Sequence, residues 1–300
     1  MEPQEFLQSR QLPDLRRPVL LAGFGGWNDA AQVATFALTT LVNAWSAERF
    51  AEIDPETFFD FTETRPTISI GPTGQRSLEW PSNYFFAHRI EEKDQDVVLL
   101  VGTEPQLRWR TFCAAVTALA ERLDVSSLVT VGGLLADVPH TVEPRLSGFA
   151  ISGGSLPDLQ RLGVRMSSYE GPTGIVGALH DAWRRTGRPA LSLWGNVPHY
   201  ISATPNPQVS LALLQRVAAL LETQLPLQAL AAQAKAFTSQ VDEALAENPE
   251  ALEYVRQLEQ QFVTEQPVQS ESPELIAELE DFLRSRRPPT EEQERDDTGT

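Results

Sequence analysis

The chain has 300 residues and a formal net charge of −17, with 41% hydrophobic and 22% charged residues. This ordinary globular composition predicts that most of the chain folds. The acidic balance and the lack of a basic stripe disfavour nucleic-acid binding, because phosphate backbones are repelled. No apolar stretch reaches the roughly 20 residues that span a bilayer, and the first residues lack the basic and apolar blocks of a signal peptide. We therefore expect a cytoplasmic protein with neither nucleic acid nor a membrane as partner.

The first expected elements are a buried strand and a helix. Residues 18–24 are a continuous apolar run, which is typical of a strand covered on both faces. Gly25 and Gly26 then interrupt the run, and Asn28 is positioned to cap the helix that follows. Apolar residues spaced three and four apart extend this helix to about Trp45.

After residues 48–90, which have a different pattern, further strands and helices alternate along the chain. Residues 48–90 combine short apolar or alternating runs with turn residues and predict a β-rich insertion. Beyond it, strands are expected at 96–102, 127–133 and 190–195, and helices at 106–123, 173–186 and from Asn206-Pro207 onward. This order predicts an α/β fold with a wound, mostly parallel sheet in a domain of residues 1–225.

The carboxyl-terminal part has a helical pattern. Apolar spacings of three and four predict a helical extension over 226–287, and polar, charged residues 288–300 predict a disordered acidic tail. Residues 226–300 hold 17 acidic and 6 basic residues, a net charge of −11. Two arrangements of the extension remain open: a hairpin packed on its own sheet, or an arm that grips another subunit or partner.

A repeated tripeptide indicates where a ligand would bind. Val138-Pro139-His140 and Val197-Pro198-His199 each follow an apolar run that ends in glycine, and Tyr169-Glu170-Gly171-Pro172-Thr173-Gly174 lies between them. If both runs are parallel strands, their carboxyl ends meet at the edge where open α/β sheets bind ligands. We therefore expect one crevice lined by these segments.

The candidate residues of this crevice fall into two groups. The candidates for catalysis are Glu104, His140, Glu170 and His199, because carboxylates and imidazoles can transfer protons. The candidates for ligand binding lie at two glycine turns, where amides at a helix start can receive an anion: Gly25, Gly26, Asn28, Asp29, Thr173 and Gly174.

Simpler roles compete with each of these candidates. The glycines can form tight turns without a ligand, Glu104 can pair with Arg108 or Arg110, and both histidines can be structural. Neither histidine belongs to a local His-x-x-x-His pair, and the single cysteine, Cys113, allows neither an internal disulfide nor a cysteine-based zinc cluster. We therefore expect no metal and no cofactor.

The motifs taken together resemble a known family. They are Gly23 to Asp29, Gly102-Thr103-Glu104-Pro105 with Arg108, Trp109 and Phe112, Gly132-Gly133 with Val138 to Thr141, Tyr169 to Ile175, and Val197 to Tyr200. Five such motifs in this order are similar to the prokaryotic branch of the proteasome assembly chaperone 2 family, over about residues 15–223. The resemblance implies a phosphorylase/hydrolase-like α/β fold, self-association, a C-terminal helical extension and no settled catalytic activity.

Two functional hypotheses result. The leading one is a non-enzymatic, homo-oligomeric binding protein, a dimer or trimer, with assembly-chaperone-like activity toward the proteasome or another protein assembly. Family members can dock through a terminus with a penultimate tyrosine, whereas this chain ends in Asp296-Asp297-Thr298-Gly299-Thr300. The helical arm or the α/β surface is therefore the expected contact. The alternative is an enzyme of hydrolase, phosphorylase or ligase type, acting on a small anionic or nucleoside-like ligand at the crevice.

Overall fold

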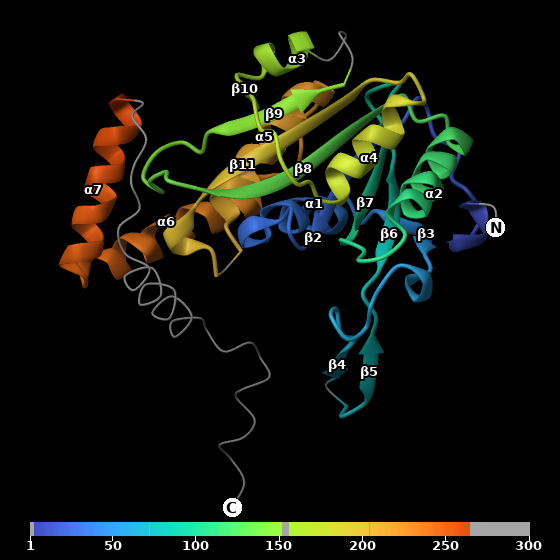
Figure 1. Ribbon diagram of the computed structural model, residues 1–300, viewed down its shortest axis with the longest axis horizontal. Helices are drawn as coiled ribbons and strands as arrows, with labels where there is room; N and C mark the ends of the chain where they lie inside the picture. The colour runs from blue at the N-terminus through green and yellow to red at the C-terminus, as the bar shows by residue number, and fades with distance from the viewer. Residues whose placement is uncertain (1–2, 72, 152–155, 204, 265–300) are drawn as a thin grey trace, which may run out of the picture.

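A nine-stranded sheet forms the centre of the molecule in the computed structural model, which describes residues 3–71, 73–151, 156–203 and 205–264 (Figure 1). The strand order is β1-β3-β6-β7-β2-β8-β11-β9-β10. These strands are β1 Leu7–Ser9, β2 Val19–Gly25, β3 Glu48–Ile53, β6 Asn83–His88, β7 Val97–Thr103, β8 Ser127–Ala136, β9 Leu146–Ala150, β10 Arg165–Met166 and β11 Ala190–Pro198.

The four strands β7, β2, β8 and β11 form a parallel core, which confirms the α/β class expected from the sequence. Most residues of these four strands are buried, as the continuous apolar runs predicted. Antiparallel strands flank this core, because β6 pairs antiparallel with β7 and β9 pairs antiparallel with β11. The sheet is therefore mixed at its sides.

Helices cover both faces of the sheet. Helices α1 and α5 pack on one face, where Leu21 of β2 contributes to the core, and α2 and α4 pack on the other, where Leu20 and Ala22 do. The bounds are α1 Val33–Ala44, α2 Trp109–Arg122, α3 Leu156–Arg161, α4 Ile175–Arg184 and α5 Pro207–Leu221. Short 3-10 helices are η1 Pro3–Phe6, η2 Ala30–Gln32, η3 Pro55–Thr57 and η4 His199–Ile201. In the described ranges, no helix is both long and apolar enough to cross a membrane.

The predicted β-rich insertion divides into two parts. Strands β3 and β6 join the main sheet, with β1 added beside β3. Between them, β4 (Thr67–Ile70) and β5 (Arg76–Glu79) form a separate two-stranded sheet, which projects from the body as an isolated ribbon (Figure 1). We call this pair of strands the β4–β5 ribbon.

The carboxyl-terminal helices pack on the α/β body of the same chain. Helix α6 (Gln228–Ala246) packs against α5, and its Leu230 belongs to the same core cluster as α1 and α5. Helix α7 (Pro249–Thr264) packs on α6 at the side of the molecule (Figure 1). The part of the expected helical extension beyond residue 264, and the tail 288–300, lie outside the described residues.

Two helix starts differ from the sequence-based expectation. Asn28 does not cap α1, which begins at Val33; the Asp29 carboxylate instead accepts hydrogen bonds from the amides of Ala34 and Thr35. Helix α2 begins at Trp109 rather than at residue 106, after Arg108 in a left-handed conformation. In both places the turn between the strand and the helix is longer than a single capping residue. The spacing of apolar residues does not show the length of such a turn.

Candidate functional site

The Glu104 carboxylate joins three segments at the carboxyl ends of β2 and β7. Its Oε1 accepts hydrogen bonds from Asn28 Nδ2 at 2.8 Å and from the Ile175 amide at 2.7 Å. Its Oε2 accepts a bond from the Trp27 amide at 3.3 Å, and the Glu104 amide donates to the Gly25 carbonyl at 2.8 Å. Glu104 therefore links the loop after β2, the end of β7 and the start of α4.

This contact occupies the amino terminus of α4. Ile175 is the first residue of the helix, where unpaired amides and the helix dipole favour a negative charge. The Glu104 carboxylate supplies that charge from within the chain, so an external anion has no vacant position at this amide. The hydrogen bonds of the Glu104 carboxylate run to Trp27, Asn28 and Ile175 rather than to Arg108 or Arg110, which fits a capping role at α4. Its candidacy for proton transfer stays a prediction.

Two glycines are required for this close approach. A Cβ atom on Gly174 would lie 2.3 Å from Asn28 Nδ2 and 2.5 Å from Glu104 Oε1. Gly26 has φ +123°, a conformation that residues with a side chain rarely adopt, and its Cβ position faces Glu104. Two of the motif glycines, Gly26 and Gly174, are thus explained by packing around the Glu104 carboxylate.

Asn28 and Asp29 hold the same loop from its other side. Asn28 is 1% exposed, and its backbone carbonyl accepts a bond from the Gly133 amide at 2.9 Å. Its side-chain Oδ1 has no partner among the described residues. Burial raises the pKa of Asp29, and its bonds with Thr35 and Ala34 oppose that rise. These contacts fix the β2 loop against β8 and the start of α1.

The two histidines lie together in a second cluster, at the ends of the neighbouring strands β8 and β11. His140 is 2% exposed, and its Nδ1 is 2.8 Å from the Tyr200 hydroxyl, which also accepts a bond from the His140 amide. The hydroxyl hydrogen therefore points at Nδ1, and Nε2–H donates to Asp242 Oδ1 of α6 at 3.1 Å. Burial lowers the pKa of His140, so the neutral ring fits this arrangement.

His199 makes the corresponding contact with α7. Its Nδ1 lies 3.2 Å from Asp137 Oδ1, and its Nε2 lies 3.1 Å from the Tyr254 hydroxyl, within hydrogen-bond distance. The Tyr200 ring packs edge-on against both imidazoles. The repeated Val-Pro-His therefore brings both imidazoles to one rim, where each is bonded to one of the two terminal helices.

The remaining candidates are more exposed. Glu170 and Thr173 lie at the surface before α4, while Gly25 ends β2 beside Thr103 of β7. The hollow next to His140 has a volume of about 10 Å³, which is room for one water molecule. Across the part of the chain that the structure describes, no group of three or more His, Cys, Asp or Glu side chains could hold a metal.

Sequence reasoning missed the partners that define the histidine cluster. They are Tyr200, Asp242 and Tyr254, of which the last two lie on α6 and α7. Tyr200 directly follows the second Val-Pro-His and was a detectable signal. Nothing in the local pattern of Asp242 or Tyr254 points to a histidine about 100 or 55 residues away.

Fold and site together define a wound α/β protein in which α6 and α7 are hydrogen-bonded to two histidines that follow the ends of β8 and β11. The PAC2 family model matches residues 23–245, so the chain belongs to the PAC2 family. This membership confirms the resemblance seen in the sequence motifs.

Solved structures agree with this assignment. A PAC2 family protein from Streptomyces avermitilis is 43% identical, with a TM-score of 0.71 and coverage of 79% of this chain and 99% of that chain. A proteasome-assembly chaperone homologue from Mycobacterium tuberculosis is 42% identical, with the same TM-score and coverage. An archaeal proteasome activator from Pyrococcus furiosus, 17% identical, shares the fold with a TM-score of 0.65 over 79% of this chain and 97% of that chain. A comparison with curated proteins found no match.

Proposed function

We propose that the protein is a non-enzymatic, homo-oligomeric binding protein with assembly-chaperone-like activity, and that proteasome components are among its partners. The observation that carries the proposal is the 42% identity to a proteasome-assembly chaperone homologue, over 79% of this chain and 99% of that one. Similarity of this extent along almost the whole relative makes a shared binding role the simplest expectation.

The β4–β5 ribbon supports a role in protein binding. Ile68 and Leu78 lie opposite each other and share one face with Ile70 and its partner Arg76. The other face is formed by Thr67, Ser69, Ser77 and Glu79. Ile68, Ile70 and Leu78 are 51 to 57% exposed, and Trp80, just after β5, is 45% exposed. Apolar side chains that gather on one exposed surface usually mark a site where a partner binds.

The size of the ribbon adds to this argument. A two-stranded hairpin alone is marginally stable in water, since each strand has one free edge and no sheet covers its apolar face. Here β4 and β5 have four residues each and pair only with one another among the described strands. We propose that the apolar face is covered within a dimer or trimer of this chain.

Light scattering coupled to gel filtration tests the oligomer. We expect a mass two or three times the 33.2 kDa protomer, and a lower mass for the double variant Ile68→Ser/Leu78→Ser. The matched control Thr67→Ala/Ser77→Ala changes the opposite face and should keep the mass. A monomeric wild-type protein would contradict the oligomer, and equal masses for all three proteins would contradict the role of the ribbon.

Partner identity needs a separate experiment. Crosslinking in native cells followed by purification of the full chain should recover proteasome components in excess over a tagged control protein. Repeated recovery of this protein alone would contradict assembly-chaperone activity while leaving the oligomer intact. The cytoplasmic location also remains a prediction, and cell fractionation of the same sample tests it.

The enzyme hypothesis has weaker support from the contacts. Glu104, His140 and His199 each use their polar atoms to hold neighbouring segments, which leaves no free acid and base side by side in the clusters described. A thermal-shift screen tests it, because a ligand at about 100 times its dissociation constant stabilises by about 2.7 kcal/mol. A clear shift with a nucleotide or sugar phosphate would favour the enzyme.

A further inference from the structure

Large apolar side chains that stay exposed gather in two places on the protein. One is the β4–β5 ribbon with Trp80 beside it. The other comprises the carboxyl end of β8 and the loops after β2, after β7 and before α4, where five such side chains are 37 to 64% exposed: Trp27, Leu107, Leu134, Leu135 and Tyr169. We call these five residues the carboxyl-edge surface.

The segments that form the carboxyl-edge surface contact one another. The Trp27 amide donates to the Glu104 carboxylate at 3.3 Å, and Leu107 follows Glu104 by three residues. The carbonyl of Asn28, next to Trp27, accepts a bond at 2.9 Å from the Gly133 amide, directly before Leu134. The loop that carries Tyr169 leads into the start of α4, which Glu104 also holds. The five side chains therefore lie at one edge of the sheet.

The β4–β5 ribbon rises from the same edge. On its first side, Gln106 Nε2 donates to Thr64 Oγ1 at 2.7 Å. On its second side, the Thr103 amide donates to the Ser82 carbonyl at 3.1 Å. From this base the ribbon projects away from the body and leaves its own apolar face uncovered (Figure 1). One copy of the chain thus presents two uncovered apolar surfaces side by side.

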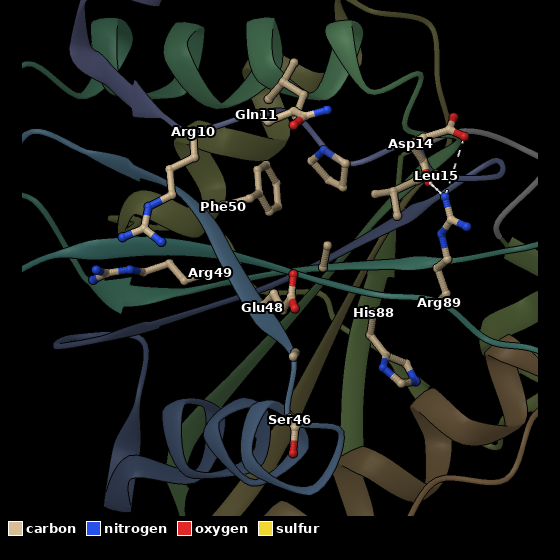
Figure 2. A pocket seen from close by; sticks show the side chains of 14 residues that line it. Arg10, Gln11, Asp14, Leu15, Ser46, Glu48, Arg49, Phe50, His88 and Arg89 are labelled. Carbon is tan, nitrogen blue, oxygen red and sulfur yellow. Dashed lines mark hydrogen bonds and ion pairs between the residues drawn. The ribbon is translucent and has the colours of Figure 1, made fainter.

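The other ends of the strands offer a hollow with a different character. It has a volume of about 570 Å³ and lies where His88 of β6 pairs with the first residue of β7. Acidic and basic side chains line it together, as Figure 2 shows for Glu48, Asp14, Arg49 and Arg89. This mixture selects no ligand by charge, whereas the exposed apolar side chains gain directly from being covered.

We propose that the apolar face of the ribbon of one copy packs on the carboxyl-edge surface of a neighbouring copy. The inference rests on the homo-oligomer proposed above and adds the surface that receives the ribbon. A second copy suits this place because both surfaces lie at one edge. A single contact between two copies at that edge covers a ribbon and a receiving surface together, and the same contact can be repeated by symmetry.

The distribution of charge favours a copy of this chain as the occupant. Residues 65–80, which contain the ribbon, hold two basic residues and one acidic residue, Arg65, Arg76 and Glu79, and so have a net charge of +1. The whole protein has a net charge of −17. Two copies repel through most of their surfaces, so they are expected to meet where one side is not acidic.

One charged pair fixes the orientation of the ribbon in this contact. Arg76 lies opposite Ile70 on the apolar face, and Glu170 lies next to Tyr169 on the receiving side. Both are exposed, and neither forms an ion pair among the described residues. We expect Arg76 to pair with Glu170 of the neighbouring copy. Arg108 gives the receiving side a cation as well, so this pair sets the register while apolar burial supplies the attraction.

Reversing the two charges tests the orientation. Light scattering on a dilution series gives the concentration at which half of the oligomer has dissociated. We expect Arg76→Glu to raise this concentration at least threefold, and Arg76→Glu/Glu170→Arg to return it to within twofold of wild type. The matched control Arg76→Glu/Glu121→Arg has the same net charge, with the new cation on α2, and should not restore the oligomer.

Cysteine crosslinking tests which surface receives the ribbon. Two differently tagged copies, Ile68→Cys and Tyr169→Cys, are expressed together and treated with a short bismaleimide. We expect a product that carries both tags, and less than a third as much when Ser77→Cys, on the opposite face of the ribbon, replaces Ile68→Cys. Burial raises the pKa of the native Cys113 to about 12, so this thiol stays unreactive.

The outcomes separate this contact from the oligomer on which it rests. A wild-type protein that is monomeric at every concentration overturns both. An oligomer in which Ile68→Cys crosslinks mainly to Ile68→Cys places ribbon against ribbon and overturns the receiving surface alone. Equal yields from Ile68→Cys and Ser77→Cys, or equal rescue by Glu170→Arg and Glu121→Arg, also overturn the proposed contact and leave the oligomer standing.

Discussion

At the scale of single residues, the Glu104 carboxylate gives the sharpest prediction. It accepts three hydrogen bonds, including one from the first amide of α4. Glu104→Gln keeps the size of the side chain but removes the charge that the helix terminus favours. We expect the free energy of unfolding to fall by about 1 to 2 kcal/mol, measured by urea denaturation.

A charge control separates this effect from a general change in net charge. Glu121→Gln also removes one negative charge, from an exposed position on α2, and should leave stability within about 0.5 kcal/mol of wild type. If the two variants unfold at the same urea concentration, Glu104 does not stabilise the start of α4.

His180 should make stability depend on pH. It is 1% exposed, its Nε2 lies 2.8 Å from Thr130 Oγ1, and burial lowers its pKa to about 3. The unfolded chain takes up a proton near pH 6.5 and the folded chain does not, so stability is full above pH 6.5 and falls as the pH drops toward 3. At pH 5 the loss is about 2 kcal/mol.

The variant His180→Gln isolates this contribution. It lacks the titrating ring, so its stability should change about 2 kcal/mol less than that of wild type between pH 7 and pH 5, measured by denaturation at each pH. The lowered pKa of His140 acts in the same direction and remains in both proteins. An unchanged pH dependence would mean that His180 is accessible to protons in the folded state.

The sequence predicted where the candidate residues lie better than which groups they contact. Val-Pro-His after two strands correctly placed His140 and His199 at one rim, because parallel strands end at the same edge of a sheet. Their hydrogen-bond partners come from α6 and α7, and the contact of Glu104 comes from α4. Such long-range partners depend on how helices pack, and short motifs carry no information about that.

At the scale of elements, Tyr200 lies between the two histidines that contact α6 and α7. Its hydroxyl bonds both the amide and Nδ1 of His140, in a buried position. Tyr200→Phe leaves these two groups without a partner, which costs roughly 1 to 3 kcal/mol. Because His140 then loses the contact that orients it toward Asp242 of α6, and α7 packs on α6, we expect faster hydrogen exchange in both helices, measured by mass spectrometry, while the β2 and β8 amides stay protected.

Tyr169→Phe serves as the matched control for this variant. Tyr169 is 64% exposed, and its hydroxyl bonds only the Pro172 carbonyl among the described residues. Its loss should leave exchange in α7 unchanged. If Tyr200→Phe also leaves α7 unchanged, other contacts hold the helix, such as the Arg145 guanidinium 3.6 Å from the centre of the Phe262 ring.

Helices with strong end signals were the easiest elements to predict. Helix α5 begins at Pro207, and the Asn206 side chain accepts a bond from the Val209 amide at 3.1 Å, as its Asn-Pro start indicated. Residues 48–90 were harder, because Phe58 and Phe59 resemble a strand in sequence but lie buried in irregular structure after η3. An apolar run reports burial more reliably than it reports the kind of element.

At the scale of the whole molecule, the boundary expected near residue 225 rests on a change in the sequence pattern. Whether the parts on either side of it also unfold independently is open to test. Leu230 of α6 is fully buried with α1 and α5. Val241 and Leu245 of α6 cover Tyr200 and Ile201 beyond the end of β11. The α/β body therefore completes two apolar clusters with residues that come after the boundary.

Chains that end at different residues test whether the body is independent. A chain ending at residue 264 serves as the reference, because it keeps α6 and α7. A chain ending at residue 225 loses Leu230 and uncovers Tyr200, and removing one buried leucine alone typically costs 2 to 5 kcal/mol. We expect its midpoint to fall by roughly 10 °C in calorimetry. Equal midpoints would show that residues 1–225 form an independent domain and that the terminal helices serve only as an attached surface.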